Sequence, residues 1–213
     1  SILDFPEDRA RIKSLLPALG KDRKKSVFVS EKVMNAEDIL VRHRNKTIVI
    51  CNRVETAQKI FLDILKKKLE ETEVICLHSR FFDSDRKKKE QLVKAYFGKH
   101  SKKKNVILVA TQVIEAGMDI SCDVMHTEIS PVNSFLQRAG RCARFENEYG
   151  EIFIYDVLSA EEKEKIVLEV IDEQDEKEIR KLNNWYLPYD EKLCKKSLAA
   201  LKQCTYLDEK IAE

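Results

Sequence analysis

The sequence predicts an α/β domain with a mainly parallel central sheet and helices on both of its faces. Two observations lead to this class. Short apolar runs alternate with helix-favouring segments, which is the order of repeated βαβ units. One run, Val106–Ala110, is apolar at every position, as is typical of a strand covered on both sides. The chain of 213 residues is long enough for one ordinary core and an appendage.

The apolar runs place the expected strands near residues 26–30, 47–51, 73–77, 106–110, 123–129 and 151–157. A helix is expected over residues 54–69, because its apolar side chains recur on one face: Ala57, Ile60, Phe61, Ile64, Leu65 and Leu69. Another is expected over residues 84–97, capped by Asp83 or Ser84. After Val157 the sequence becomes highly charged and helix-favouring, which predicts a helical C-terminal extension.

The composition describes an ordinary soluble domain. The formal net charge is +2, from 39 basic and 37 acidic residues, so any basic surface must be local. The six cysteines show no C-x-x-C and no metal-ligand spacing, so no metal site is expected from them. No apolar run approaches the length needed to span a membrane. We therefore expect a cytoplasmic protein without a membrane partner.

Residues 110–144 are the most informative part of the chain. Thr111 and Gln112 follow an expected strand, at the end where ligands bind to open α/β sheets, and a hydroxyl beside free backbone N–H groups suits a phosphate. Gly117 tolerates the left-handed conformation that ends a helical turn, and Asp119 follows it. Considered singly, Thr111 has a simpler explanation as a helix cap, and Asp119 has one as an ordinary turn residue.

A helix is then expected to begin with Ser130 as its N-cap and Pro131 at its first position. Helical spacing places Gln137, Arg141 and Arg144 on the side opposite the apolar stripe. This segment uses arginine three times and lysine never, although lysine outnumbers arginine in the whole chain. Planar, bidentate recognition of phosphate explains that choice; a solvated basic face is the alternative.

The segment His-Ser-Arg at 78–80 follows the expected strand 73–77. It therefore lies at the same edge of the sheet as Thr111. Hydroxyl and guanidinium groups at this edge suit the backbone phosphates of a single nucleic-acid strand, and an ordinary turn after a strand is the alternative.

These residues resemble the superfamily 2 helicases. Ala110–Asp119 resembles motif V, and Gln137–Arg144 (QRAGRCAR) resembles motif VI. Together with ISPVNSFLQRAGR they are most similar to the helicase part of the CRISPR-associated helicase-nuclease of type I interference systems. Ile48–Arg53 resembles motif IV, and Leu77–Arg86 resembles the Leu-His-Ser-Arg-Phe segment of that family. The resemblance covers residues 45–157.

One departure and one absence qualify the resemblance. Ala-Gly-Met precedes Asp119, where many relatives carry Gln-Ser-Leu, which leaves the subtype open. A phosphate-binding P-loop is absent, since neither Gly20-Lys21 nor Gly98-Lys99 fits its pattern. The resemblance thus implies a RecA-like three-layer sandwich that is the second helicase lobe alone, over residues 26–158. Residues 1–25 would lead in from a missing first lobe, and residues 159–213 would form a charged helical extension or connector.

The resemblance also implies roles for named residues. ATP with Mg²⁺ would bind between the two lobes, with the metal held mainly by the missing one. Arg141 and Arg144 would be catalytic arginine fingers. Because both are expected to project from the side of the helix opposite its apolar stripe, truncating either should change the stability of the fold by about 0.5 kcal/mol or less. The remaining ATP contacts would come from Gln137, Gly117, Asp119 and Arg138. Contacts to single-stranded DNA would come from Asn52, Arg53, His78, Ser79, Arg80, Thr111 and Gln112.

The parent protein implied by this resemblance would translocate along single-stranded DNA and feed a nuclease module in concert with an RNA-guided interference complex. The fragment alone would hydrolyse no ATP. Two other functions remain open: another superfamily 2 motor, such as an RNA helicase or a DNA-repair translocase, and a non-catalytic nucleic-acid-binding module.

Overall fold

The computed structural model describes residues 24–68, 70–115, 117–159, 161–162, 185–203 and 206–208. In these residues the strands form one seven-stranded sheet in the order β3-β4-β2-β5-β6-β1-β7. All neighbouring strands are parallel except β7, which pairs antiparallel with β1. The strands are β1 Lys24–Val33, β2 Lys46–Ile50, β3 Glu73–Leu77, β4 Val106–Ala110, β5 Val124–Glu128, β6 Tyr149–Asp156 and β7 Tyr206–Asp208.

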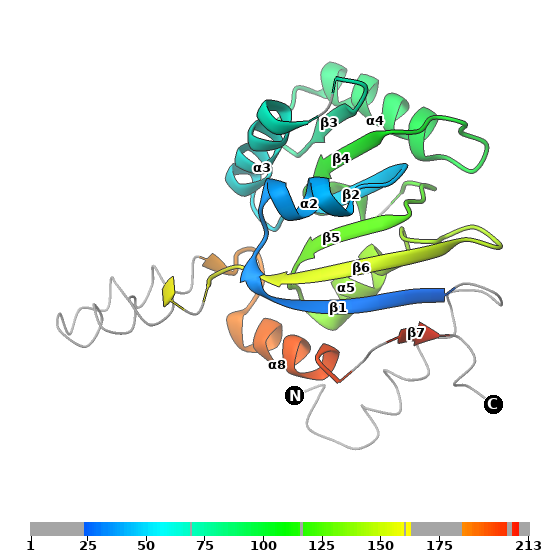
Figure 1. The fold of residues 1–213 in the computed structure, drawn as a ribbon. Helices are drawn as coiled ribbons and strands as arrows, with labels where there is room; N and C mark the ends of the chain where they lie inside the picture. The colour runs from blue at the N-terminus through cyan, green and yellow to red at the C-terminus, as the bar shows by residue number, and fades with distance from the viewer. Residues whose placement is uncertain are drawn as a thin grey trace.

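Helices cover both faces of this sheet (Figure 1). One face carries α2 (Ala36–Arg42) and α3 (Val54–Lys67), whose buried residues form a core with Val49, Ile107 and Val109. The opposite face carries α4 (Asp83–Phe97), α5 (Val132–Ala139) and α8 (Glu191–Leu201). Successive residues of β4 alternate between these two cores, as pleated strands require. The expected three-layer α/β sandwich with a mainly parallel sheet is confirmed.

Several local expectations need correction. Helix α4 begins at Asp83, and its N-cap Phe82 makes no side-chain cap hydrogen bond, so neither Asp83 nor Ser84 is the cap. Leu65 of α3 is exposed and does not belong to the buried face, because the stripe there is only wide enough for Ala57, Ile60 and Ile64. Leu69 lies outside the described residues.

The described C-terminal residues rest on the same lobe. Strand β7 extends the sheet beyond β1, and α8 contributes Cys194 and Leu201 to the core shared with α5. Most of the remaining extension and the first 23 residues lie outside the described residues. Among the residues that the structure describes, no helix is long and apolar enough to cross a membrane.

Candidate nucleotide and nucleic-acid site

The carboxyl ends of β2, β3 and β4 meet at one edge of the sheet. Ile50 and Leu77 both pair with Ala110, so the residues that follow the three strands are neighbours. Backbone hydrogen bonds continue past the strand ends: the Thr111 N–H donates to the Leu77 carbonyl at 3.2 Å and the Cys51 N–H donates to the Ala110 carbonyl at 2.9 Å. The expectation that these segments share an edge is confirmed.

Four of the residues at this edge hold the turns in place with their own side chains or backbone. Asn52 is 4% exposed; its amide donates to the Ile129 carbonyl at 2.8 Å, and its backbone N–H donates to Glu128 Oε2 at 2.5 Å. Gln112 donates to the Asn52 carbonyl at 2.7 Å. Thr111 and His78 are also buried. Direct contact with a nucleic acid is therefore restricted to groups that project beyond this layer.

The projecting groups are Ser79, Arg80 and Arg53. Ser79 and Arg80 are exposed, and the Arg80 guanidinium forms an ion pair with Glu55 at 2.5 Å. Arg53 lies over the ring of Trp185 at 4.9 Å. Because both arginines sit at the rim, their charges stay available to an anionic ligand in solvent.

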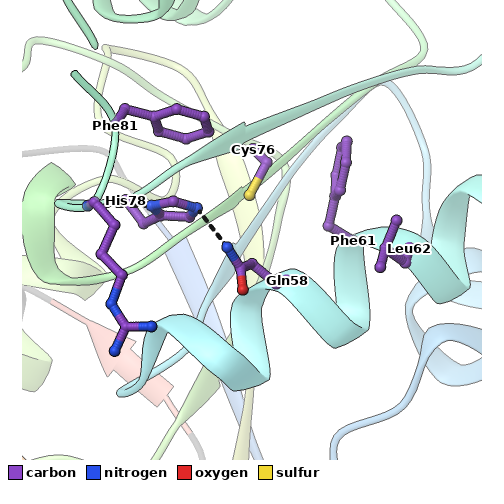
Figure 2. Close-up of a pocket in the computed structure, with 7 residues that line it drawn as sticks. Gln58, Phe61, Leu62, Cys76, His78 and Phe81 are labelled. Carbon is purple, nitrogen blue, oxygen red and sulfur yellow. Dashed lines mark hydrogen bonds between the residues drawn. The ribbon is translucent and has the colours of Figure 1, made fainter.

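A groove of about 440 Å³ lies between α3 and the turn after β3, shown in Figure 2. Gln58 and His78 line this groove and are in hydrogen-bond contact at 3.3 Å, and the His78 ring stacks on Phe81 at 4.2 Å. Burial and the nearby Arg80 and Lys89 charges lower the pKa of His78. The neutral imidazole is thus favoured, and His78 supports the turn without adding positive charge.

The arginine segment departs from the expected helix. Helix α5 ends at Ala139, and its N-cap is Pro131, with Ser130 one residue earlier and its hydroxyl buried without a partner. Arg141 and Arg144 follow the helix and do not lie on its surface. Cys142 forms a parallel bridge with Cys122, and Ala143 has a positive φ of 43°. The helical-wheel argument for these two arginines was therefore wrong, because the helix closes in a turn at Gly140 and Arg141 and Cys142 then pairs with Cys122.

Arg141 is held by the turn that follows β4. It is 9% exposed, and its guanidinium donates to the Ile114 carbonyl at 3.3 Å and to the Glu115 carbonyl at 2.9 Å. Burial and the nearby Arg144 charge lower the pKa of Arg141, while Asp119 raises it. Two guanidiniums and one carboxylate are therefore gathered around Arg141.

Arg144 and Asp119 form an ion pair in which Asp119 remains 68% exposed. Gly117, which precedes this acid, has a φ of 75°, in the left-handed region that the sequence predicted. Gln137 is exposed on the last turn of α5. Asp119 and Arg144 thus present polar atoms to solvent beside Arg141.

Arg138 occupies a different environment. Its side chain is fully buried, and all of its nitrogens donate hydrogen bonds of 2.8 to 3.0 Å, to Glu115, Thr127, the Glu128 carbonyl, Asn52 and Tyr189. A guanidinium used in this way is not free to bind a nucleotide. The structure therefore gives it the task of joining the turns at the sheet edge.

Sequence reasoning missed four residues of this network. Glu115 pairs with Arg138, Tyr189 bonds to both of them, and Trp185 lies under Arg53. Burial raises the pKa of Glu128, which accepts the Asn52 N–H. A sequence signal existed for Glu115 and Glu128, since each follows or ends an apolar run. Trp185 and Tyr189 lie too far along the chain for a local sequence pattern to place them at this edge.

The fold and this edge define a class: a RecA-like lobe of a superfamily 2 helicase. Residues 43–147 match the family described as CRISPR-associated nuclease/helicase Cas3, C-terminal. Through this segment the chain belongs to the Cas3 family and contains its C-terminal helicase lobe. The expected family is confirmed.

Relatives agree with that assignment. The chain is 37% identical over 103 residues to the CRISPR-associated endonuclease/helicase Cas3 of Escherichia coli K12, covering 47% of this chain and 12% of that protein. Its fold is similar to the crystal structure of T. fusca Cas3-AMPPNP, with a TM-score of 0.58 and 25% identity over 64% of this chain and 19% of that one. It is also similar to a chain of a CRISPR RNA-guided surveillance complex, pre-nicking, with a TM-score of 0.51 and 27% identity over 64% and 19%.

Proposed function

We propose that this chain is the second motor lobe of an ATP-dependent helicase that moves along single-stranded DNA in CRISPR interference. One observation carries the proposal: Arg141, Arg144 and Asp119 gather next to the turn that follows β4, where the Arg141 guanidinium donates to the Ile114 and Glu115 carbonyls. This is where a nucleotide bound against a second lobe meets cations and an acid. The T. fusca relative whose structure carries AMPPNP supports the choice of nucleotide.

The three side chains suit the parts of ATP differently. A guanidinium binds phosphate oxygens through paired N–H groups and neutralises the charge that develops during transfer. Arg141 and Arg144 supply two such groups, while the exposed Asp119 carboxylate suits the hydroxyls of a ribose. Gln137 and the Gly117 turn complete the surface. The Arg144–Asp119 ion pair would open as the nucleotide arrives, which costs little because the pair is exposed.

Mg²⁺ and the phosphate cradle would come from another RecA-like lobe. The guanidinium groups of Arg141 and Arg144 suit an anion and not a divalent cation, and the neighbouring Asp119 carboxylate is already paired with Arg144. We therefore propose that this chain alone hydrolyses no ATP. The nuclease module and the RNA-guided interference complex are proposed as further partners, the latter supported by the surveillance-complex relative.

DNA would run along the carboxyl edge of β2, β3 and β4, touching Ser79, Arg80 and Arg53. Ser79 and Arg80 are exposed and Arg53 is half-buried over Trp185, and their hydroxyl and guanidinium groups suit backbone phosphates. Asn52, His78, Thr111 and Gln112 would act beneath them by fixing the turns, because they are buried or hydrogen-bonded within the edge. Binding through such contacts would be weak in sequence preference and sensitive to salt.

The proposal is tested by Arg144→Ala in the full-length parent protein. ATP hydrolysis stimulated by single-stranded DNA should fall by about 10³- to 10⁵-fold, as with other arginine fingers, and Arg144→Lys should restore little because an ammonium lacks the planar fork. Arg44→Ala is the matched control, since Arg44 is an exposed arginine that pairs with Glu151 and not with Asp119. Near-normal hydrolysis by Arg144→Ala would refute the proposal.

A further inference from the structure

We propose that Tyr189 is a positioning residue for Arg141, acting through Glu115. Tyr189 lies beyond the segment that matches the family, which ends at residue 147. The inference deepens the proposed function, because it rests on a role for Arg141 in nucleotide hydrolysis. In this proposal the C-terminal segment that carries Tyr189 contributes to the nucleotide site of the lobe.

The Tyr189 hydroxyl sits between two charged groups. It accepts a hydrogen bond from Arg138 Nη2 at 3.0 Å and donates one to Glu115 Oε1 at 3.1 Å. The same Glu115 oxygen accepts from Arg138 Nε at 2.8 Å. Glu115 and Arg138 are therefore linked twice, once directly and once through the phenol. The Arg138 side chain is fully buried and the Glu115 side chain only 11% exposed, so water competes little for these bonds.

Glu115 also holds Arg141. Its backbone carbonyl accepts from Arg141 Nη2 at 2.9 Å, and the preceding carbonyl of Ile114 accepts from Arg141 Nε. The position of residue 115 thus sets the position of the Arg141 guanidinium. The Glu115 side chain is held by Arg138 and Tyr189, while its backbone carbonyl binds Arg141. Glu115 is therefore a rigid support for Arg141.

The segment that presents Tyr189 is itself anchored. Tyr186 is buried and its hydroxyl donates to Asp156 at 2.9 Å, and the Tyr189 N–H donates to the Tyr186 carbonyl. Asp190 caps α8 by accepting from the Leu193 N–H at 3.0 Å. Trp185 lies against Arg53 at the rim. The Tyr189 side chain therefore projects from a turn that is fixed at both ends, and this turn places its hydroxyl between Arg138 and Glu115.

Tyr189→Phe removes only the hydroxyl. Arg138 and Glu115 keep their direct bond, and the aromatic packing is unchanged, so the fold should survive. The variant loses the connection between Arg138 and Glu115 through the Tyr189 hydroxyl, so Glu115 becomes less rigidly held. In the 213-residue chain we expect the Arg141 Nε–H to exchange with solvent about tenfold faster, the equivalent of one buried hydrogen bond. Arginine-selective nitrogen NMR measures this exchange directly.

Tyr155→Phe is the matched control. It removes the same atom from a buried tyrosine of the other core, whose hydroxyl lies 2.9 Å from His126 Nδ1 and contacts neither Glu115 nor Arg138. The proposal expects faster Arg141 exchange in Tyr189→Phe and wild-type exchange in Tyr155→Phe. Wild-type exchange in Tyr189→Phe overturns it. Equal acceleration in both variants overturns it as well, because that result is a general loosening of the lobe.

A second measurement separates this inference from the proposed function. In the full-length parent, Tyr189→Phe should lower kcat for ATP hydrolysis by about tenfold, while the DNA concentration that half-saturates the rate stays the same. An unchanged kcat overturns the positioning role. If Arg141→Ala and Arg144→Ala also hydrolyse ATP normally, the proposed function has failed; if they are inactive, only the role of Tyr189 has.

Discussion

Arg138 donates a hydrogen bond to the side chain of Asn52 at 3.0 Å, although the two residues are 86 positions apart in the chain. The bond ties the helix that precedes the arginine segment to the turn that follows β2. Asn52 also holds the Ile129 carbonyl, so a single amide joins three segments of the edge. Its loss would disturb the proposed nucleotide and DNA contacts together.

Arg138→Ala should destabilise the lobe by about 3–5 kcal/mol, because it leaves Glu115 as an unpaired acid in a buried site. Arg138→Lys should recover only part of that loss, since an ammonium cannot reach five acceptors in a plane. Urea denaturation of the 213-residue chain measures both, with Arg44→Ala as the exposed control. A loss below 1 kcal/mol in Arg138→Ala would show that the network contributes little to folding.

Arg141 and Arg144 should differ in their effect on stability. Arg144 is partly exposed and paired with an exposed acid, so Arg144→Ala should cost about 0.5 kcal/mol or less. Arg141 is buried and bonded to two carbonyls, so Arg141→Ala should cost about 1–3 kcal/mol. This revises the sequence-based expectation that both truncations leave the fold unchanged. Equal thermal denaturation midpoints for the two variants would contradict it.

His126 should make the lobe less stable as the pH falls. Burial lowers the pKa of His126 to about 3, below the value of about 6.5 in an unfolded chain. Between these values the unfolded state binds more protons, so stability falls as the pH decreases, by about 2 kcal/mol from pH 6.5 to 5. The raised pKa of Glu128 acts in the opposite direction: its contribution is lost as the pH rises.

The His126 contribution is isolated by comparison with His126→Phe, which keeps a ring to stack on Phe153. Urea denaturation of both proteins at pH 7, 6 and 5 should show a steeper loss in the wild type. Parallel curves would mean that His126 does not titrate in this window.

Gly150→Ala should displace the arginine segment. A Cβ at this position would overlap Cys142 Sγ and lie 3.1 Å from the Ala143 Cβ, so β6 or the segment must shift. Overpacking of this kind costs about 1–3 kcal/mol, and ATP hydrolysis by the full-length parent should fall with it. Tyr149→Phe, at an exposed neighbour, serves as the control. Wild-type stability and activity in Gly150→Ala would show that the contact relaxes freely.

Regular elements and strand-end positions were predictable because each depends on local pattern. Val106–Ala110 had to be a covered strand, and Thr111 had to leave it at the edge. The end of α5 was not predictable in this way, since the pairing of Cys142 with Cys122 outweighs the helical preference of the residues after Gly140. The burial of Arg138 depends on Tyr189 and Glu128, and strand β7 depends on pairing with β1; such partners are fixed by the folded chain alone.

The early end of α5 determines how the two arginines are attached to the lobe. Arg141 and Arg144 do not lie at a free helix end, because the bridge between Cys122 and Cys142 joins their segment to the central sheet. In the proposed motor, both guanidiniums would therefore move together with this lobe, and the distance to the second lobe would determine whether they contact the nucleotide. When the two lobes separate, Arg144 would pair again with Asp119.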